Sequence, residues 1–184
     1  KRIKVFQKHI DQSLSIFPFE KNWFETRSVV TSFVGHPFSD IVGPETNKTQ
    51  FLSKHGLSKS DDVLILLPGS RQQEIDRLWP IYCRTIDMLR SEIPELKIIV
   101  GKASGVIIPN VIKNLLYEEQ DVRAAMAHGT VALTASGTAT LECAVLDTPE
   151  VVCYKLSILS GQIAKKINRS PFISMANLIV GRKI

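Results

Sequence analysis

The sequence predicts an α/β fold, a doubly wound parallel β-sheet with helices on both faces. Uninterrupted apolar runs such as residues 63–67 are bounded by turn residues, which is typical of strands buried on both faces. Segments with helical spacing of apolar residues alternate with these runs. Small and polar residues follow two of the strands, at the sheet edge where open α/β folds bind their ligands. These patterns together predict a ligand-binding sheet.

The composition is that of an ordinary globular protein. Of the 184 residues, 44% are hydrophobic and 22% charged, which permits a substantial core. No apolar run approaches the roughly 18 residues of a membrane span and no signal peptide opens the chain, so we expect a cytosolic protein. The net charge of +5 favours acidic partners such as phosphates, nucleotides or an anionic membrane surface. Because the chain does not begin with Met, we expect a portion of a longer protein.

Several kinds of chemistry find no support in the sequence. The dinucleotide-binding, nucleoside triphosphatase and hydrolase glycine motifs are absent. We expect neither a metal site nor a cofactor, because the histidines are scattered and the cysteines lack metal-type spacing. The cysteines lie in apolar surroundings and are expected to be buried, reduced thiols; they are Cys83, Cys143 and Cys153.

The first forty residues predict two helices and two strands. The expected elements are a helix at 1–13, a strand at 14–17, a helix at 20–25 and a strand at 29–34. The stretch from His36 to Thr49 is rich in glycine, proline and polar residues, so we expect a domain boundary there. The sequence thus predicts a division into residues 1–40 and 41–184.

Expected strands and helices alternate along the rest of the chain. The strands are 63–67, 96–100, 131–135 and 151–154, and the helices are 49–56, 80–91, 110–116, 121–127, 138–146 and 158–167. Pro80 suits the first turn of its helix, and Asn110 and Asp121 suit N-caps. The helix at 158–167 has one apolar side and two lysines near its end. It is expected to face the core or to lie on a membrane surface.

Residues 136–142 predict a phosphate site. The small residues Ser136, Gly137 and Thr138 let the backbone approach a ligand, and the amides and dipole of a helix start favour phosphate. Glu142 lies one turn beyond Thr138, about 6 Å along the axis at roughly 1.5 Å per residue, a separation similar to that between phosphate and ribose. An ionised Glu142 could accept both hydroxyls of a ribose. A plain helix start with an exposed glutamate has the same spacing.

The loop after the strand at 63–67 is a second candidate phosphate site. Gly69 and Ser70 offer backbone amides, and the guanidinium of Arg71 can bridge two phosphate oxygens. The alternative is a turn with a surface arginine that pairs with Glu74.

These motifs resemble those of the bacterial lipid-A-disaccharide synthases. The resemblance rests on Leu67-Pro68-Gly69-Ser70-Arg71 with Glu74 and on residues 135–142. Four further stretches agree in the same order, so that the match spans nearly the whole chain. They are Phe17-Pro18-Phe19-Glu20, Val34-Gly35-His36-Pro37, Val152-Cys153-Tyr154-Lys155, and Asn177-Leu178 through Gly181-Arg182.

The resemblance implies a B-type glycosyltransferase, two Rossmann-like domains facing across a cleft. Residues 1–40 would end the amino-terminal, acceptor domain and begin the linker, and residues 41–184 would form the UDP-sugar-binding half, incomplete at its end. Such enzymes transfer 2,3-diacylglucosamine from UDP to 2,3-diacylglucosamine 1-phosphate, with inversion, at the inner face of the inner membrane of Gram-negative bacteria. The expected partners are these two substrates and the membrane surface. No nucleic acid is expected, and a homodimer is left open.

The resemblance also implies roles for individual residues. The two loops would bind the UDP diphosphate, Glu142 would bind the ribose hydroxyls, and Arg71 would act in catalysis by stabilising the leaving diphosphate. The expected substrate-binding residues are Gly69, Ser70, Arg71, Glu74, Ser136, Gly137, Thr138, Glu142, Asn177 and Arg182. The general base is not expected in this chain, so the chain alone is expected to be inactive.

Three departures from the family pattern concern the substrate pockets. Most of the amino-terminal domain is missing, and the family continues beyond Gly181-Arg182 with a segment that returns to the cleft. Between Leu116 and Asp121 the family would place an additional strand and loop, where this chain has only residues 117–120. The uracil pocket is therefore not predicted from this sequence.

Two other functions compete with a disaccharide synthase. One is another UDP-sugar enzyme of the same architecture, such as a UDP-N-acetylglucosamine 2-epimerase or a peptidoglycan glycosyltransferase. Their loops are richer in glycine than the one at 136–140. The other is a non-catalytic nucleotide-binding module.

Overall fold

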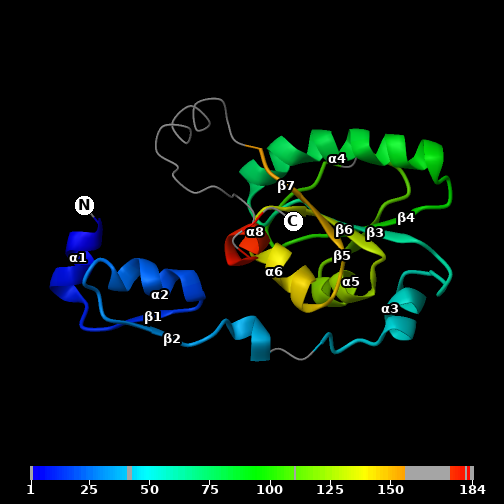
Figure 1. Ribbon diagram of the computed structural model, residues 1–184. Coiled ribbons are helices and arrows are strands. Elements are labelled where there is room, and N and C mark those ends of the chain that lie inside the picture. Colours follow the sequence, from blue (N-terminus) through cyan, green and yellow to red (C-terminus); the bar gives the residue numbers. More distant parts are fainter. Residues whose placement is uncertain (1, 41–42, 110, 156–174, 181, 183–184) are drawn as a thin grey trace.

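The computed structural model describes residues 2–40, 43–109, 111–155, 175–180 and 182. Within these ranges the strands form two separate parallel sheets, one of two strands near the amino terminus and one of five strands (Figure 1). The five-stranded sheet confirms the predicted α/β class. No helix in the described part of the chain is long and apolar enough to cross a membrane.

The amino-terminal residues form the small sheet and two helices. In order they are α1 (Arg2–His9), β1 (Ser13–Ser15), α2 (Pro18–Glu25) and β2 (Thr31–Phe33), followed by the 3-10 helix η1 (Pro37–Asp40). The four predicted elements are present with different bounds: the strands are shorter, α1 ends at His9 rather than at residue 13, and α2 begins at Pro18 rather than at residue 20. Pro18 occupies the first position of α2, where its missing N–H leaves no carbonyl unpaired.

The large sheet has the strand order β5-β4-β3-β6-β7, and all neighbours are parallel. The strands are β3 (Val63–Leu67), β4 (Lys97–Gly101), β5 (Leu116–Glu118), β6 (Val131–Ala135) and β7 (Glu150–Cys153). β3 is central, because Ile65 pairs with Ile99 on one side and with Ala132 on the other. All five residues of β3 are buried, as its uninterrupted apolar run predicts.

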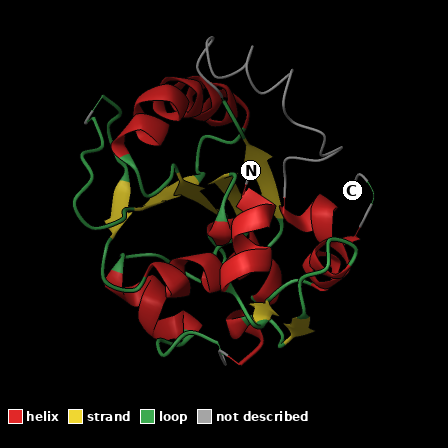
Figure 2. Cartoon of the chain, turned by 90° about the vertical axis from the view of Figure 1, so that its left-hand side faces the viewer, coloured by secondary structure: helices red, strands yellow, loops and turns green. Residues whose placement is uncertain are grey.

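Two hydrophobic cores lie on opposite faces of this sheet, so it is doubly wound. On one face, Leu64 and Leu66 pack with Tyr82 and other residues of α4 (Gln72–Glu92). On the other face, Ile65 packs in a cluster with residues of three helices. These helices are α3 (Lys48–Lys54), α5 (Val122–His128) and α6 (Thr138–Val145). Figure 2 shows the sheet between its two helical layers.

The segment before α3, residues 43–47, is fixed to α5 through Thr46. The Thr46 hydroxyl donates to Asp121 Oδ2 at 2.6 Å, and the Thr46 carbonyl lies 2.7 Å from His128 Nε2. Asp121 also caps α5, because its other carboxylate oxygen accepts from the Ala124 amide at 2.9 Å. The predicted N-cap is thus confirmed, and the same side chain binds the segment before α3 to the start of α5.

The prediction that Pro80 begins a helix is wrong. α4 begins at Gln72, and Pro80 lies inside it, exposed to solvent. Buried residues at helical spacing before and after Pro80 hold the helix on the sheet, which outweighs the hydrogen bond that proline cannot donate. These residues are Ile75, Leu78, Trp79, Tyr82 and Ile86.

The predicted helix at 110–116 is also wrong. Residues 111–115 are irregular, Asn110 lies outside the described residues, and Leu116 begins β5. Asn114 has a φ of 59°, a left-handed conformation that ends any helix. Leu116 pairs with Ile99, and Glu118 with Gly101, so contacts to β4 decide the conformation. A strand, β5, thus occupies part of the stretch in which the family pattern places an additional strand and loop, and a short connection leads from it to α5.

The remaining described helix, α8 (Met175–Val180), packs against α6. The helix predicted at 158–167 lies outside the described residues.

Candidate functional site

A cleft of about 420 Å³ lies at the carboxyl ends of β3 and β6. The chain passes from β3 to β4 on one side and later to β6 on the other, so the cleft sits where the strand order reverses. Open α/β sheets bind ligands at this point, and the volume is that of a small-molecule site. The cleft is lined by Leu67, Gly69, Ser70, Arg71, Glu74, Gly101, Ala103, Val122, Met126, Ala135, Ser136, Gly137, Thr138, Ala139 and Glu142.

The tertiary structure brings the two predicted loops together. Eight of the ten predicted substrate-binding residues line the cleft, and Asn177 and Arg182 do not. Asn177 belongs to α8, which packs against α6, and Arg182 is exposed beyond the end of α8.

Glycine is required in the loop that follows β3. Gly69 has a φ of 116°, and a Cβ there would lie 2.6 Å from Glu74 Oε2. The absence of a side chain therefore lets the Glu74 carboxylate lie against the loop.

The alternative interpretation of Arg71 as a surface ion pair has a structural basis. Its Nη1 lies 2.8 Å from Glu74 Oε1, and the arginine side chain is 79% exposed. Exposed ion pairs contribute about 0–1 kcal/mol, so the guanidinium can turn to an anionic ligand at little cost. Both residues also line the cleft, so the ion pair and a phosphate-binding role are compatible.

The loop after β6 leaves room above its backbone. A Cβ on Gly137 would meet no atom within 4 Å, and Gly137 is exposed at the mouth of the cleft. The Ser136 amide donates to the Cys153 carbonyl at 2.9 Å, which fixes the loop to β7. The amides of Thr138 and Ala139 begin α6, where helix geometry provides no intrahelical partner and the dipole is positive. This end of α6 is suited to an anion.

Glu142 lies one turn along α6 from this helix start. Its side chain is 25% exposed and lines the cleft, while Arg123 Nη1 lies 3.8 Å from its Oε1. Sequence reasoning missed Arg123 because it belongs to no motif. The available signal was a single arginine between the apolar residues Val122 and Ala124 on the predicted helix at 121–127.

The cysteines carry no activated thiol. Burial raises the pKa of Cys143 to about 12, with further contributions from Glu150 and Glu142. Burial also raises the pKa values of Cys83 and Cys153. All three are free of disulfides, but only Cys143 is fully buried and the other two are partly exposed. Protonated thiols at neutral pH are poor nucleophiles.

A buried carboxylate that the sequence did not indicate lies beside α3. Glu118 is 1% exposed, and its Oε2 lies 2.6 Å from Lys54 Nζ and 3.0 Å from His55 Nε2. Its Oε1 accepts from the amides of Gln120 and Asp121 at 2.9 and 3.0 Å. Burial raises the pKa of Glu118, but these hydrogen bonds outweigh it and lower the pKa to about 2. The group joins α3, β5 and the start of α5.

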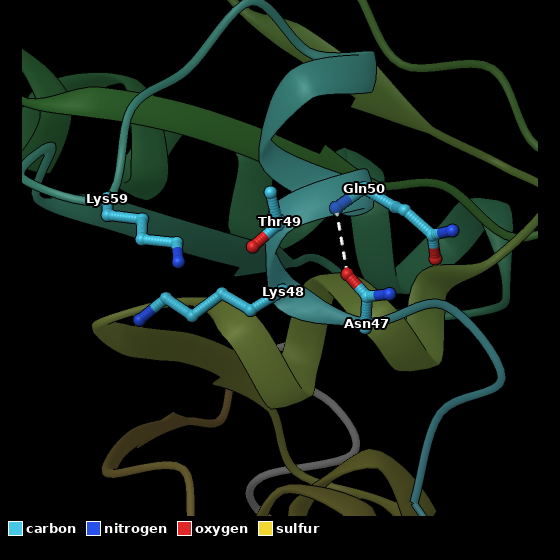
Figure 3. Close-up of a pocket in the computed structure, with 5 residues that line it drawn as sticks. All are labelled: Asn47, Lys48, Thr49, Gln50 and Lys59. Carbon is cyan, nitrogen blue, oxygen red and sulfur yellow. Dashed lines mark hydrogen bonds between the residues drawn. The ribbon is translucent and has the colours of Figure 1, made fainter.

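A second hollow, of about 650 Å³, lies at the start of α3 and shares no residue with the cleft. Figure 3 shows its lining, in which the Asn47 side chain accepts from the Gln50 amide and caps the helix. All its lining residues are exposed; they are Asn47, Lys48, Thr49, Gln50 and Lys59. The cleft at the strand ends, built from several elements, is therefore the candidate site. Across the described ranges, no three His, Cys, Asp or Glu side chains gather in a group that could hold a metal ion.

Comparison with known proteins agrees with the motifs. A family model described as lipid-A-disaccharide synthetase matches residues 1–184. Similar proteins include the lipid-A-disaccharide synthases of Granulibacter bethesdensis, 32% identical over 191 residues, and Geobacter metallireducens, 33% over 196 residues. Lipid-A-disaccharide synthase 2 of Legionella pneumophila is 33% identical over 193 residues.

These comparisons cover 100% of this chain and 49%, 50% and 50% of the three relatives. The chain thus spans about half the length of the curated relatives it matches. Because the family model extends over every residue and the family's two loop motifs meet in one cleft, the chain belongs to the lipid-A-disaccharide synthase family.

Proposed function

We propose that the protein is an inverting glycosyltransferase of lipid A biosynthesis. It would transfer 2,3-diacylglucosamine from UDP to 2,3-diacylglucosamine 1-phosphate and release UDP. The observation that carries this proposal is the meeting of the two loop motifs and Glu142 in one cleft at the reversal of strand order. The family match supports the choice of substrates, and relatives named lipid-A-disaccharide synthase align with the whole chain.

The proposed donor lies along α6. The loop at 69–71 and the start of α6 at Gly137 and Thr138 hold the diphosphate, with Ser136 shaping the turn through its bond to β7. Glu142 accepts the ribose hydroxyls one turn further along. Asn177 and Arg182 remain proposed substrate contacts because they match the family's late motif, and Glu74 aligns Arg71.

In the reaction, an acceptor hydroxyl attacks the anomeric carbon, and the bond from that carbon to the phosphate oxygen breaks. Negative charge grows on the departing diphosphate, where Arg71 and the amides of α6 stabilise it. A base must take the hydroxyl proton. The two carboxylates that line the cleft, Glu74 and Glu142, each lie beside an arginine. This supports a general base that is contributed from outside the 184 residues of this chain.

The division into residues 1–40 and 41–184 remains our proposal for the two domains. The separate small sheet before residue 40 supports it. Action at the inner face of the inner membrane is proposed from the family, and the net charge of +5 suits an anionic surface. A second UDP-sugar activity such as epimerisation is not favoured, because the synthase family model covers residues 1–184.

The proposal is tested in the full-length protein with Arg71→Lys. The variant keeps the charge but loses the planar fork that bridges two phosphate oxygens, so disaccharide formation should fall by about tenfold to a hundredfold, and by more than UDP affinity falls. The matched control is Arg84→Lys at an exposed position of α4. If both variants have the same turnover and the same UDP affinity, Arg71 forms only a surface ion pair and does not bind the diphosphate.

A further inference from the structure

Arg123 is unusual among the charged residues around the cleft. It lies in the first turn of α5, and its side chain is 19% exposed. Its Nε and Nη2 atoms are buried and have no hydrogen-bond partner in the described part of the chain. A guanidinium remains charged at any physiological pH, and burying it is costly unless a counter-charge lies nearby. A second observation, the position of Glu142, explains why this cost is tolerated.

The counter-charge is the carboxylate of Glu142, with Nη1 of Arg123 at 3.8 Å from Oε1. Glu142 lines the cleft, as do Val122 and Met126 of α5, whereas Arg123 does not. The carboxylate of this pair therefore lines the cleft, and the guanidinium is not among its lining groups.

The distance leaves the carboxylate available to a ligand. At 3.8 Å the pair attracts electrostatically but exceeds the 2.7–3.2 Å range typical of an N–H···O hydrogen bond. Both oxygens of Glu142 thus keep lone pairs that could accept two neighbouring hydroxyls. A closer, bidentate arginine would compete with those hydroxyls.

We propose that Arg123 is a positioning residue that aims the Glu142 carboxylate at the cleft, so that the site selects ligands with a vicinal diol. The inference rests on the proposed function, in which Glu142 binds the ribose. The selection for a diol is measured by a ratio of two dissociation constants, that of 2′,3′-dideoxy-UDP divided by that of UDP.

The experiment is calorimetry on the full-length protein and its variants with both ligands. Glu142→Gln should lower the ratio to near one. Arg123→Met removes the charge at similar length and should lower the ratio by about fivefold or more, because pairwise coupling between contacting residues is of that order. In the double variant the ratio should fall no further than in Glu142→Gln. Arg123→Lys restores the charge and should return the ratio to within about threefold of the parent.

The controls separate positioning from folding. If Arg123 only supports the fold, Arg123→Met weakens both ligands equally, and the ratio stays at the parent value. That result, with a ratio near one in Glu142→Gln, overturns the inference and leaves the proposed function standing. If the parent protein itself has a ratio near one, the inference about Arg123 and the proposed binding of ribose by Glu142 are both wrong. If Arg123→Met does not fold, Arg123→Gln gives the same decision, and the exposed Arg84→Met is the matched control.

Discussion

Two glycines of the cleft meet different physical constraints. Gly69 needs a left-handed backbone with a φ of 116° and touches the Glu74 side chain, so the fold requires glycine there. Gly137 has an extended backbone with a φ of 171° that any residue can adopt, and its vicinity is empty. Stability therefore explains the first glycine, and space for a ligand explains the second.

Alanine substitution should separate the two explanations. Gly137→Ala should change the free energy of unfolding by less than about 0.5 kcal/mol, but weaken UDP binding by about tenfold or more, because the methyl group displaces a phosphate from the α6 amides. Gly69→Ala should destabilise the protein by about 1–3 kcal/mol through backbone strain and the clash with Glu74. Urea unfolding and calorimetry measure both quantities. Parent-like UDP affinity in Gly137→Ala would place the diphosphate elsewhere.

At the scale of elements, α4 is held by its packing rather than by its own sequence. Its buried side chains contact the sheet on both sides of Pro80 in sequence. Proline at an interior position cannot donate to the carbonyl four residues earlier, which belongs to Asp76. Tertiary packing thus maintains a helix that local preference would divide.

We expect Pro80→Ala to raise the free energy of unfolding by about 1–3 kcal/mol. Alanine restores the hydrogen bond, and the exposed site has no packing to lose, although the more flexible unfolded chain offsets part of the gain. Urea unfolding measures the change, with Arg84→Ala on the same helix as the control. A lower free energy of unfolding in Pro80→Ala would contradict this expectation and show that the proline ring stabilises the helix despite its exposure.

Glu118 joins three elements, so its ionisation should govern acid stability. Its pKa of about 2 is lower in the folded protein than the ordinary value of 4.5, so ionised Glu118 stabilises the fold above pH 4.5. This stabilisation is lost as the pH falls from about 4.5 to about 2. Glu118→Gln should therefore lower the free energy of unfolding by about 2–3 kcal/mol at pH 7. Between pH 4.5 and pH 2 the variant should lose less stability than the parent, because it lacks this ionisable group.

Denaturant unfolding from pH 7 to pH 2 tests this expectation. Glu119→Gln is the matched control, because Glu119 is half exposed and pairs with Lys102 at the surface. It should cost less than about 1 kcal/mol. Identical acid dependence of Glu118→Gln and the parent would assign the acid transition to other groups.

At the scale of the whole molecule, the cleft is built by topology. The two loops are far apart in the chain and meet because β3 and β6 are adjacent parallel strands that end at the same edge. Thr46, in the segment before α3, binds Asp121 at the start of α5, and η1 packs against α6. Described residues between the two sheets therefore contact helices that border the cleft. The described residues around this cleft include the groups that we propose bind the leaving diphosphate and the ribose.

We expect the 184-residue chain to bind UDP but to form no disaccharide by itself. Inverting transfer also requires a base beside the acceptor hydroxyl and a site for the acceptor sugar. Mass spectrometry of a mixture with donor and acceptor measures the product, with the full-length protein as positive control and circular dichroism to verify folding. Disaccharide above the uncatalysed background would reveal a base within these residues.

Local signals were sufficient for much of this protein. Apolar runs bounded by turn residues predicted β3, β4, β6 and β7. For β3, β4 and β6 the reason is that a strand buried on both faces leaves a continuous apolar pattern, whereas the edge strand β7 is partly exposed. The two loops and Glu142 could be selected because small residues, a cation and a carboxylate follow strand ends directly. Their roles as ligand contacts remain predictions.

Only the tertiary structure decided the remaining features. β5 forms because Leu116 pairs with a residue of β4, and α4 extends over its full length because its apolar side chains pack against the sheet. Both partners are distant in sequence, so a pattern of neighbouring residues cannot indicate them. The approach of Arg123 to Glu142 depends on the packing of α5 beside α6. The sequence by itself thus determined which segments could form strands and loops. Their contacts across the chain determined which charges meet, because electrostatic and packing energies depend on distances in space.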